Sequence, residues 1–325
     1  MNLSEVDCTQ FFDELGPRER TRERIVLELT EHTYFPEGEP STGWLPKVRR
    51  AFRILAGSLS NGKIEHGTVC IVGCGPALDG ILAAEILRPD YLVLTDVHED
   101  VVATGKRNVL RNCVSQTAIR IDAYVSDLCQ ALIYHKIKAD LIYENLPNLA
   151  TPGDVNLDDG ALSASFFAIS ETQRNIIPSE FAEHMLALHY TCLMEARECL
   201  RPGGEIISCI GARIPQKIIF RMFRELGYSP ALVVVDLVEQ FEAEKVLAEY
   251  ARVERDKPNM EFVFYDLDKG REQLRKLEER GVELERLADA MADLGISFNA
   301  QTAANRHSLG QRVAVLGLVI RGKLS

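Results

Sequence analysis

The chain has 325 residues, of which 46% are hydrophobic and 26% are charged, a composition that suits a globular protein with a full core. Its formal net charge of -11 opposes binding to a phosphate backbone, because affinity for nucleic acid depends on clustered Lys and Arg. Apolar runs are too short for a membrane span, and charged residues interrupt the N-terminal region where a signal peptide would lie. We therefore expect a cytoplasmic protein that acts on a small molecule, with neither nucleic acid nor membrane as a partner and with a homodimer as one possible assembly.

Cysteine and histidine spacing gives no sign of a metal or redox site. The eight cysteines lie in apolar segments without the Cys-x-x-Cys spacing of zinc or redox centres, and we expect reduced core residues. The seven histidines offer no ligand set at metal-binding spacing, so no metal ion is expected. The cysteines are Cys8, Cys70, Cys74, Cys113, Cys129, Cys192, Cys199 and Cys209.

Short apolar runs alternate with helical patterns over residues 68–237, which predicts βαβ units and a parallel sheet. The runs are almost wholly apolar, as is typical of strands buried on both faces. The predicted strands are Thr68–Val72, Tyr91–Thr95, Ala118–Val125, Ala139–Tyr143, Glu205–Ile210 and Ala231–Leu237. The predicted helices lie near Leu78–Leu87, Val101–Asn112, Leu128–Lys136, Ser179–Leu200 and Pro215–Leu226.

The core therefore spans residues 67–240, and residues 311–325 complete it. The apolar run Arg312–Ile320 is expected to pair antiparallel beside the sixth strand. This predicts an α/β fold with a doubly wound, mostly parallel, seven-stranded, Rossmann-like sheet.

Two additions flank this core. Residues 1–66 are expected to be helical around Glu19–Leu29 and Leu45–Leu59, and an aromatic, Pro-rich loop between these helices suggests a lid. Residues 241–310 form an insertion before the last strand, with helix Phe241–Val253, the strand-like run Glu261–Tyr265 and the charged helical stretch Arg271–Leu294.

A glycine loop follows the first predicted strand. Gly73, Cys74 and Gly75 come directly after Val72, and glycine lets the backbone turn tightly against a ligand before the next helix. This pattern favours a nucleoside site. A tight strand-to-helix turn without a ligand is the alternative.

Polar residues end the next two strands. Asp96, followed by Val97, can accept hydrogen bonds from both ribose hydroxyls, although Asp96 or Asp100 could instead cap a helix. Ser126 and Asp127 stand where methyltransferases bind adenine, and Asp127 could instead cap its helix. Together with the glycine loop, these positions predict an adenosine-binding edge.

A dinucleotide cofactor is the obvious rival. Leu78 stands where the third glycine of Gly-x-Gly-x-x-Gly should be, so a pyrophosphate would lose its close backbone approach. S-adenosylmethionine has no phosphate, and we therefore expect this molecule as cofactor or substrate.

The end of the fourth strand, Asn145-Leu-Pro-Asn148, resembles the Asn-Pro-Pro-Tyr motif of N-methyltransferases. In that motif Asn holds the acceptor nitrogen near the reactive carbon, which makes Asn145 a candidate for both binding and catalysis. A loop signal without function is the alternative. Tyr143, Tyr34 and Trp44 could supply aromatic faces to a sulfonium, although each could equally be a core residue.

From Arg201 to Asp266 the sequence resembles the methyltransferase domain of methionine S-methyltransferases, a class I S-adenosylmethionine-dependent fold. The most distinctive matches are Gly211, Arg213 and Gln216, and with the glycine loop the similarity covers roughly residues 33–266. Azetidine-2-carboxylate synthases, which cyclise S-adenosylmethionine itself, share this pattern. The resemblance implies either activity.

One departure favours cyclisation. Methyltransferases usually carry Asp or Glu two positions before the first glycine, near the methionyl ammonium, and here that residue is Ile71. Without the carboxylate, an α-amine of pKa ~7.7–8.0 in water is freer to lose its proton and attack Cγ. The expected activity is thus cyclisation to azetidine-2-carboxylic acid with release of methylthioadenosine. Methylation of methionine or another amino compound, and non-catalytic binding of S-adenosylmethionine, are the alternatives.

Overall fold

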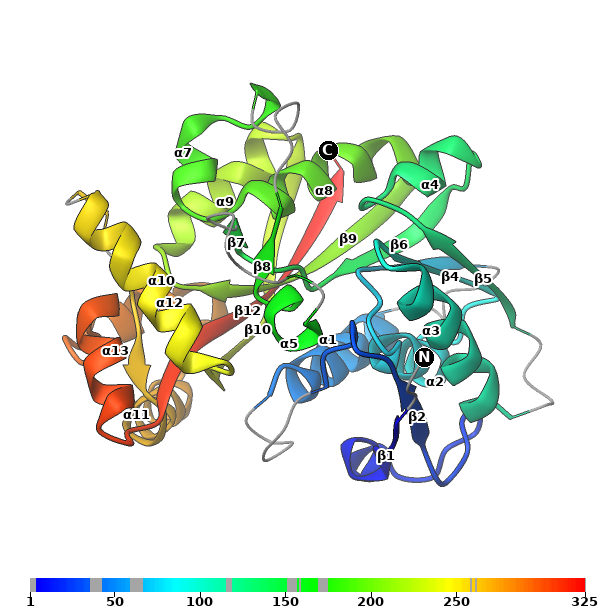
Figure 1. Ribbon diagram of the computed structural model, residues 1–325, viewed down its shortest axis with the longest axis horizontal. Coiled ribbons are helices and arrows are strands. Elements are labelled where there is room, and N and C mark those ends of the chain that lie inside the picture. Colours follow the sequence, from blue (N-terminus) through cyan, green and yellow to red (C-terminus); the bar gives the residue numbers. More distant parts are fainter. Residues whose placement is uncertain are drawn as a thin grey trace.

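The computed structural model describes residues 4–35, 43–58, 67–114, 119–150, 157, 159–168, 175–257, 259–260 and 262–324. One mixed sheet crosses the molecule, with the strand order β5-β4-β3-β6-β9-β12-β10 (Figure 1). Its strands are β3 (Thr68–Val72), β4 (Tyr91–Asp96), β5 (Arg120–Val125), β6 (Ala139–Glu144), β9 (Leu200–Ala212), β10 (Tyr228–Glu239) and β12 (Val313–Leu324). The predicted start of one strand at Ala118 lies outside the described residues.

Strands β5, β4, β3, β6 and β9 are parallel, and β12 lies antiparallel between β9 and β10. The predicted antiparallel pairing of the last strand with the sixth is therefore confirmed, and the sheet is doubly wound and mostly parallel as expected. The strand count was wrong by one, because the short strand β11 (Tyr265–Asp266) adds to β12 and makes eight.

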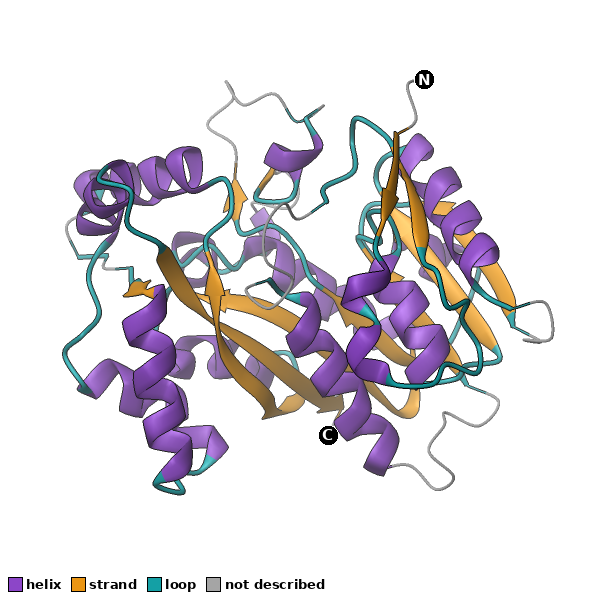
Figure 2. Ribbon diagram, turned by 90° about the horizontal axis from the view of Figure 1, so that it is seen from below, coloured by secondary structure: helices purple, strands orange, loops and turns teal. Residues whose placement is uncertain are grey.

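Helices cover both faces of the sheet (Figures 1 and 2). Alternate residues of a strand point to opposite faces, so Val69 and Ile71 of β3 pack with one set of helices and Cys70 and Val72 with the other. The first set is α1 (Leu45–Ser58), α2 (Leu78–Ile86) and α3 (Glu99–Asn112). The second set includes α4 (Gln130–Tyr134), α8 (Ala187–Cys199) and α9 (Gln216–Glu225).

All eight cysteines are buried and unpaired, as expected. No helix in the described part of the chain has the length and apolar character needed to cross a bilayer. The buried apolar residues form two layers, one on each side of the sheet.

The helix predicted over Ser179–Leu200 is broken. The structure has α7 (Ser179–Glu183) and α8, with Met185 between them at a positive φ of 58° that a continuing helix cannot adopt. Two short strands and a short helix, none of them predicted, lie between β6 and α7: β7 (Leu149–Ala150), α5 (Gly160–Ser163) and β8 (Phe166–Phe167).

The insertion is helical and gathers at one end of the sheet (Figure 1). The single helix predicted over Arg271–Leu294 is two helices, because Gly281 turns the chain at φ 73°. The strand-like run is reduced to β11, and α13 was not predicted. The helices are α10 (Ala243–Asp256), α11 (Leu267–Glu279), α12 (Leu284–Asp293) and α13 (Ala300–Ser308).

The N-terminal segment is partly extended. Helix α1 confirms the helix predicted from Leu45, but the helix predicted over Glu19–Leu29 is wrong. Strands β1 (Ser4–Asp7) and β2 (Val26–Leu29) form an antiparallel ribbon there. Two 3-10 turns, Thr9–Phe11 and Asp13–Leu15, lie between these strands in the chain.

Two asparagines of α3 explain why β2 is extended. The Asn108 amide accepts a hydrogen bond from Glu28 N at 2.8 Å and donates one to Glu28 O at 2.9 Å. Asn112 does the same for Val26 at 2.9 and 2.8 Å. The two side chains thus replace a neighbouring strand, a tertiary interaction that no local sequence pattern records.

Asn108 also donates to Pro76 O at 3.0 Å, so it joins β2 to the glycine loop. We expect Asn108→Ala to lower the free energy of unfolding by about 1–3 kcal/mol, because one buried and two partly buried backbone groups lose their partner. Urea denaturation measures this. The control Arg111→Ala, which removes exposed ion pairs with Glu5 and Glu28, should cost at most about 1 kcal/mol. Equal effects of the two changes would contradict this account of β2.

Candidate functional site

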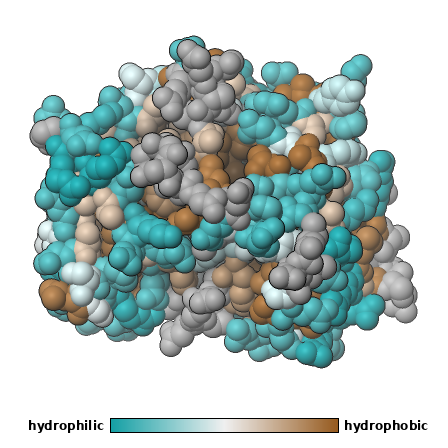
Figure 3. Space-filling view, viewed as in Figure 1, coloured by the Kyte–Doolittle hydropathy of each residue, from teal (hydrophilic) through white to brown (hydrophobic). Residues whose placement is uncertain are grey.

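A cleft of about 590 Å³ opens at the carboxyl ends of the parallel strands, within the roughly 300–1,000 Å³ range of small-molecule sites. Figure 3 shows a hollow with hydrophobic residues in its walls on a largely hydrophilic face. Most residues predicted for the site line the cleft. These are Tyr34, Gly73, Cys74, Gly75, Asp96, Val97, Ser126, Asp127 and Asn145, and Trp44 joins them.

The glycine loop depends on its two glycines. Gly73 and Gly75 have φ values of 67° and 48°, in the left-handed region that glycine adopts without strain. A Cβ on Gly73 would lie 3.0 Å from Leu146 Cδ2, so the loop after β6 also packs too closely on this glycine to admit a side chain. The loop backbone therefore stays open toward the cleft.

Asp96 is tied to the same loop. One of its carboxylate oxygens accepts a hydrogen bond from Gly75 N at 3.0 Å, and the other accepts from His98 N at 3.3 Å. Burial raises the pKa of Asp96, and the backbone donors act against this rise. The N-cap of α3 is His98, without a side-chain cap, so neither Asp96 nor Asp100 caps this helix. Asp96 keeps lone pairs for a ligand in the cleft.

Ser126 and Asp127 follow β5 at the rim of the cleft. Ser126 Oγ accepts from Ala131 N at 2.9 Å, and the N-cap of α4 is Cys129 without a side-chain cap. Asp127 therefore does not cap this helix. Val97 is 58% exposed, and it forms an apolar edge beside these polar groups.

The loop after β6 is held by a buried polar chain. His189 Nδ1 lies 3.0 Å from both oxygens of Glu144, and both side chains are fully buried. The Asn148 amide donates to Met185 O and to His189 Nε2, both at 3.3 Å. His189 Nε2 is then the acceptor, which assigns the ring proton to Nδ1 facing Glu144. This series of hydrogen bonds continues to Arg213, whose Nη1 donates to Asn148 Oδ1 at 3.4 Å.

The Arg213 guanidinium therefore lines the cleft and is held there by uncharged side chains. Its other terminal nitrogen donates to Gln240, and its guanidinium carbon lies 5.0 Å above the Tyr250 ring. No carboxylate of the described residues forms an ion pair with it. Sequence reasoning singled out Arg213 only as part of a family pattern, and its place in the cleft was missed.

Asn145 itself is half-buried and lines the cleft. Within the described residues, no hydrogen bond occupies its side-chain amide. The polar chain behind it fixes the loop, so this amide is offered to a ligand with both a donor and an acceptor.

Three aromatic rings form one wall of the cleft. The Tyr34 ring centroid lies 5.9 Å from that of Trp44 and 6.4 Å from that of Phe241. All three residues line the cleft, and Phe241 was not predicted as a site residue. Rings grouped in this way attract cations through their π faces. Of the Pro-rich loop that follows Tyr34, residues 36–42 lie outside the described chain.

Tyr143 does not line the cleft, contrary to its prediction as a catalytic residue. It is 1% exposed, and its ring packs edge-on against Phe52 of α1 at 5.4 Å, because its place in β6 points it into the core. Its hydroxyl lies near Asp79, so Tyr143 reaches the cleft only through that residue.

The cleft has a carboxylate where the sequence suggested a loss. Ile71 is fully buried in the core and does not line the cleft, but Asp79, in the first turn of α2, does. Burial raises the pKa of Asp79 to about 6, while the nearby Tyr143 hydroxyl, the hydrogen bond from Trp44 Nε1 and the charge of Lys47 act against this rise. The cleft therefore holds a carboxylate from position 79, although position 71 carries none.

Two segments meet as a roof. Gly160 N donates to Glu31 O at 2.9 Å, and a Cβ on Gly160 would lie 2.6 Å from the Thr33 backbone. The α5 segment and the residues after β2 therefore touch over the cleft, and both contribute to its lining. The lid expected from the N-terminal region stays a prediction.

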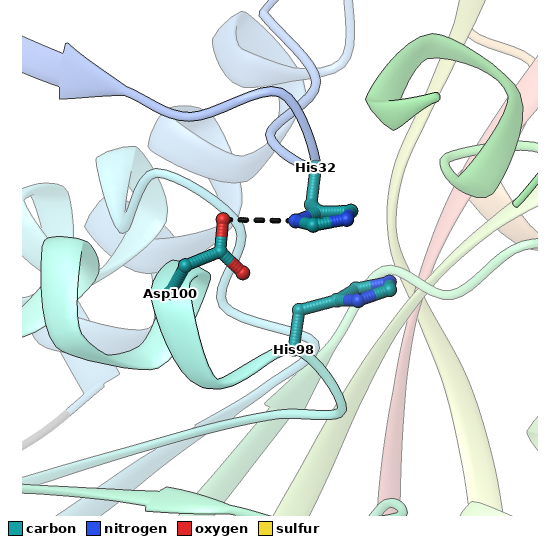
Figure 4. A group of neighbouring side chains, drawn as sticks. All are labelled: His32, His98 and Asp100. Carbon is teal, nitrogen blue, oxygen red and sulfur yellow. Dashed lines mark hydrogen bonds and ion pairs between the residues drawn. The ribbon is translucent and has the colours of Figure 1, made fainter. Parts of the chain in front are cut away.

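Two histidines stack at the rim. Figure 4 shows the His32 and His98 rings face to face. The ring centroids lie 4.5 Å apart, the ring planes are 7° from parallel, and His32 Nδ1 lies 2.9 Å from an Asp100 carboxylate oxygen. The three groups offer ligand atoms within 4.8 Å of one another, a cluster that sequence spacing did not reveal. A metal ion binds imidazole along an in-plane lone pair, and parallel stacked planes do not converge on one ion. The expectation of no metal stays a prediction.

No protein-family model and no curated protein matches the sequence. Solved structures do match. The precorrin-6y C5,15-methyltransferase of Geobacter metallireducens is 10% identical with a TM-score of 0.36, over 59% of this chain and 75% of that one. A methyltransferase of Pyrococcus furiosus is 17% identical with a TM-score of 0.35, over 66% and 82%. A 16S rRNA methyltransferase of T. thermophilus is 14% identical with a TM-score of 0.43, over 72% of this chain and 48% of that one. These likenesses concern the fold, and the function proposed below rests on the cleft.

The raised pKa of Asp79 makes stability depend on pH. Its folded pKa of about 6 exceeds the ordinary value of 3.8, so the folded state binds more protons between these values. This contribution to stability is present below pH 4 and is lost as the pH rises to about 6. Asp79→Asn should remove the slope, measured as the difference between the unfolding free energies of the two proteins at each pH. The exposed control Asp268→Asn should keep it, and a slope retained by Asp79→Asn would refute the assignment.

Proposed function

We propose that this protein is an enzyme that binds S-adenosylmethionine in the cleft. The observation that carries the proposal is the convergence of four strand ends on one space. Gly73 and Gly75 follow β3, Asp96 ends β4, Ser126 follows β5 and Asn145 follows β6. In open α/β sheets ligands bind outside the carboxyl ends of the strands. Asp96 would accept from the ribose hydroxyls, and the bare glycine loop would face the methionyl part.

We infer further that the reaction is intramolecular cyclisation. The aromatic wall of Tyr34, Trp44 and Phe241 suits a sulfonium, whose positive charge ring faces attract. The contact between the α5 segment and the residues after β2 also narrows the space beside the cleft, which favours a compact, folded substrate. In this reaction the α-amine, after losing its proton to solvent, forms a bond to Cγ. The Cγ–S bond breaks, and sulfur keeps the electron pair as neutral methylthioadenosine leaves.

Methyl transfer to a small amino compound is the second candidate. It is favoured by Asn145, because its unoccupied amide followed by Pro147 offers the donor and acceptor that hold an amine in N-methyltransferases. In that reaction the product from S-adenosylmethionine is S-adenosylhomocysteine. The two candidates therefore differ in a product that is easily measured.

Incubation of the purified protein with S-adenosylmethionine alone decides between them. Mass spectrometry should find methylthioadenosine and azetidine-2-carboxylic acid in equal amounts. S-adenosylhomocysteine that forms only when an amino compound is added would establish methyl transfer and reject cyclisation. No turnover with a panel of amino compounds, despite tight binding, would point to a binding protein.

Asn145→Ala should lower kcat by about 10²-fold or more while changing the Kd of S-adenosylmethionine little, because its amide orients the reacting amine. Steady-state rates and calorimetry measure the two quantities. Asn305→Ala, on the exposed side of α13, is the matched control and should leave both unchanged. A variant at position 145 with normal kcat would remove Asn145 from the mechanism.

Asp96→Ala should weaken S-adenosylmethionine and methylthioadenosine alike, by roughly 10- to 100-fold, because both carry the ribose that its carboxylate is proposed to hold. Calorimetric titration of each compound tests this. Full affinity for both compounds after the change would contradict the ribose assignment.

A further inference from the structure

One cation in the cleft is almost wholly buried. Lys47 lies in the first turn of α1 and is 2% exposed, and within the described part of the chain its Nζ has a single hydrogen bond, to Gly43 O at 3.2 Å. Its charge is felt by Asp79 and Asp236, but no carboxylate of the described residues forms an ion pair with it. A buried ammonium with one neutral acceptor lacks the partners that such groups normally have.

The sheet makes room for this side chain. A Cβ on Gly317, in the middle of β12, would lie 2.6 Å from Lys47 Cε. Gly317 pairs with Gly211 of β9, and a Cβ there would lie 2.5 Å from Arg213 Nη1. Residues directly opposite in an antiparallel pair share one face. Two strand side chains are therefore absent at the same place, and two cleft cations, Lys47 and Arg213, occupy the space.

An acid stands in the same region. Asp79 lines the cleft with Lys47, and its carboxylate accepts from Trp44 Nε1 at 3.3 Å. The Trp44 backbone carbonyl in turn starts α1, accepting from Lys47 N at 3.1 Å. The start of α1 thus carries the positive Lys47, and its Trp44 indole is hydrogen-bonded to the negative Asp79. Among the described residues, the Lys47 ammonium and the Asp79 carboxylate do not form an ion pair with each other.

We propose that Lys47 and Asp79 form a clamp for an α-amino acid group, with Lys47 binding its carboxylate and Asp79 its amino group. The proposal rests on the proposed function, because the group it names is the methionyl end of S-adenosylmethionine. The two opposite charges match the two ends of a zwitterion. Held at both ends, the methionyl chain has its amine and its Cγ fixed relative to each other.

A ligand-binding role and a purely structural role of Lys47 predict different ligand affinities for one variant. Lys47→Met keeps the length of the stem and removes the charge. If Lys47 only filled the space at Gly317, this change would leave ligand affinity untouched. If Lys47 binds a carboxylate, affinity falls while the free protein keeps or raises its Tm, since a buried ammonium no longer has to be desolvated.

The test compares two probes in calorimetric titrations. S-adenosylhomocysteine carries the amino acid end, and methylthioadenosine lacks it. Lys47→Met should weaken S-adenosylhomocysteine by roughly 10- to 100-fold and leave methylthioadenosine unchanged. The control Arg53→Met, on the exposed face of α1, should change neither. Unchanged affinity for S-adenosylhomocysteine, or equal weakening of both probes, would overturn the clamp.

Asp79→Asn supplies the second arm. It should also weaken S-adenosylhomocysteine selectively, because an amide neutralises less of the amino group's charge than a carboxylate does. An affinity equal to that of the unchanged protein would remove Asp79 from the clamp. Failure of the proposed function looks different, since the unchanged protein would then bind neither probe.

Discussion

The site depends on one constraint of chain topology. Strand β3 lies between β4, which follows it through α2 on one face, and β6, which the chain reaches only after β5. Connections that leave neighbouring parallel strands toward opposite faces diverge, and a crevice remains at their carboxyl ends. Every polar residue that we assign to adenosine stands at this crevice. The glycine loop, Asp96 and the loop after β6 are close together because the sheet ends there.

A second feature follows from the first. The crevice is floored by apolar strands, so any polar group that reaches it must be supported from within the protein. Glu144, His189 and Asn148 provide such support behind Asn145, and Arg213 ends the same chain. Neutral amides and a tautomerically defined imidazole separate the two charges. The loop after β6 is consequently held by hydrogen bonds on the side away from the cleft.

The sheet was predictable because strands buried on both faces are continuous apolar runs, as at Thr68–Val72. The meeting of Gly73, Asp96 and Ser126 at one edge of the sheet was predictable because these residues follow or end those strands. Strand β2 was not, since its partners are Asn108 and Asn112, far away in the chain. The break at Met185 likewise has no glycine or proline to mark it.

The inner end of the cleft was missed for related reasons. Asp79 reads as an ordinary acid in the first turn of a helix, where it is common. Lys47 reads as an exposed residue, although its spacing of four from Ala51 and eight from Leu55 places it on the buried stripe of α1. That spacing was the available signal. Phe241 lies just after β10, where an insertion was expected and no ligand contact was sought.

The paired glycines Gly211 and Gly317 have a consequence for comparing this protein with its relatives. In a chain with valine or alanine at either position, the end of the Arg213 or the Lys47 side chain would have to move from its present place, and at position 317 Val238 would have to move as well. Glycine at positions 211 and 317, in the centre of the sheet, would then be part of the sequence pattern that accompanies selectivity for an amino acid group. A search for relatives with the same substrate should therefore require small residues on β9 and β12 before it counts charged ones.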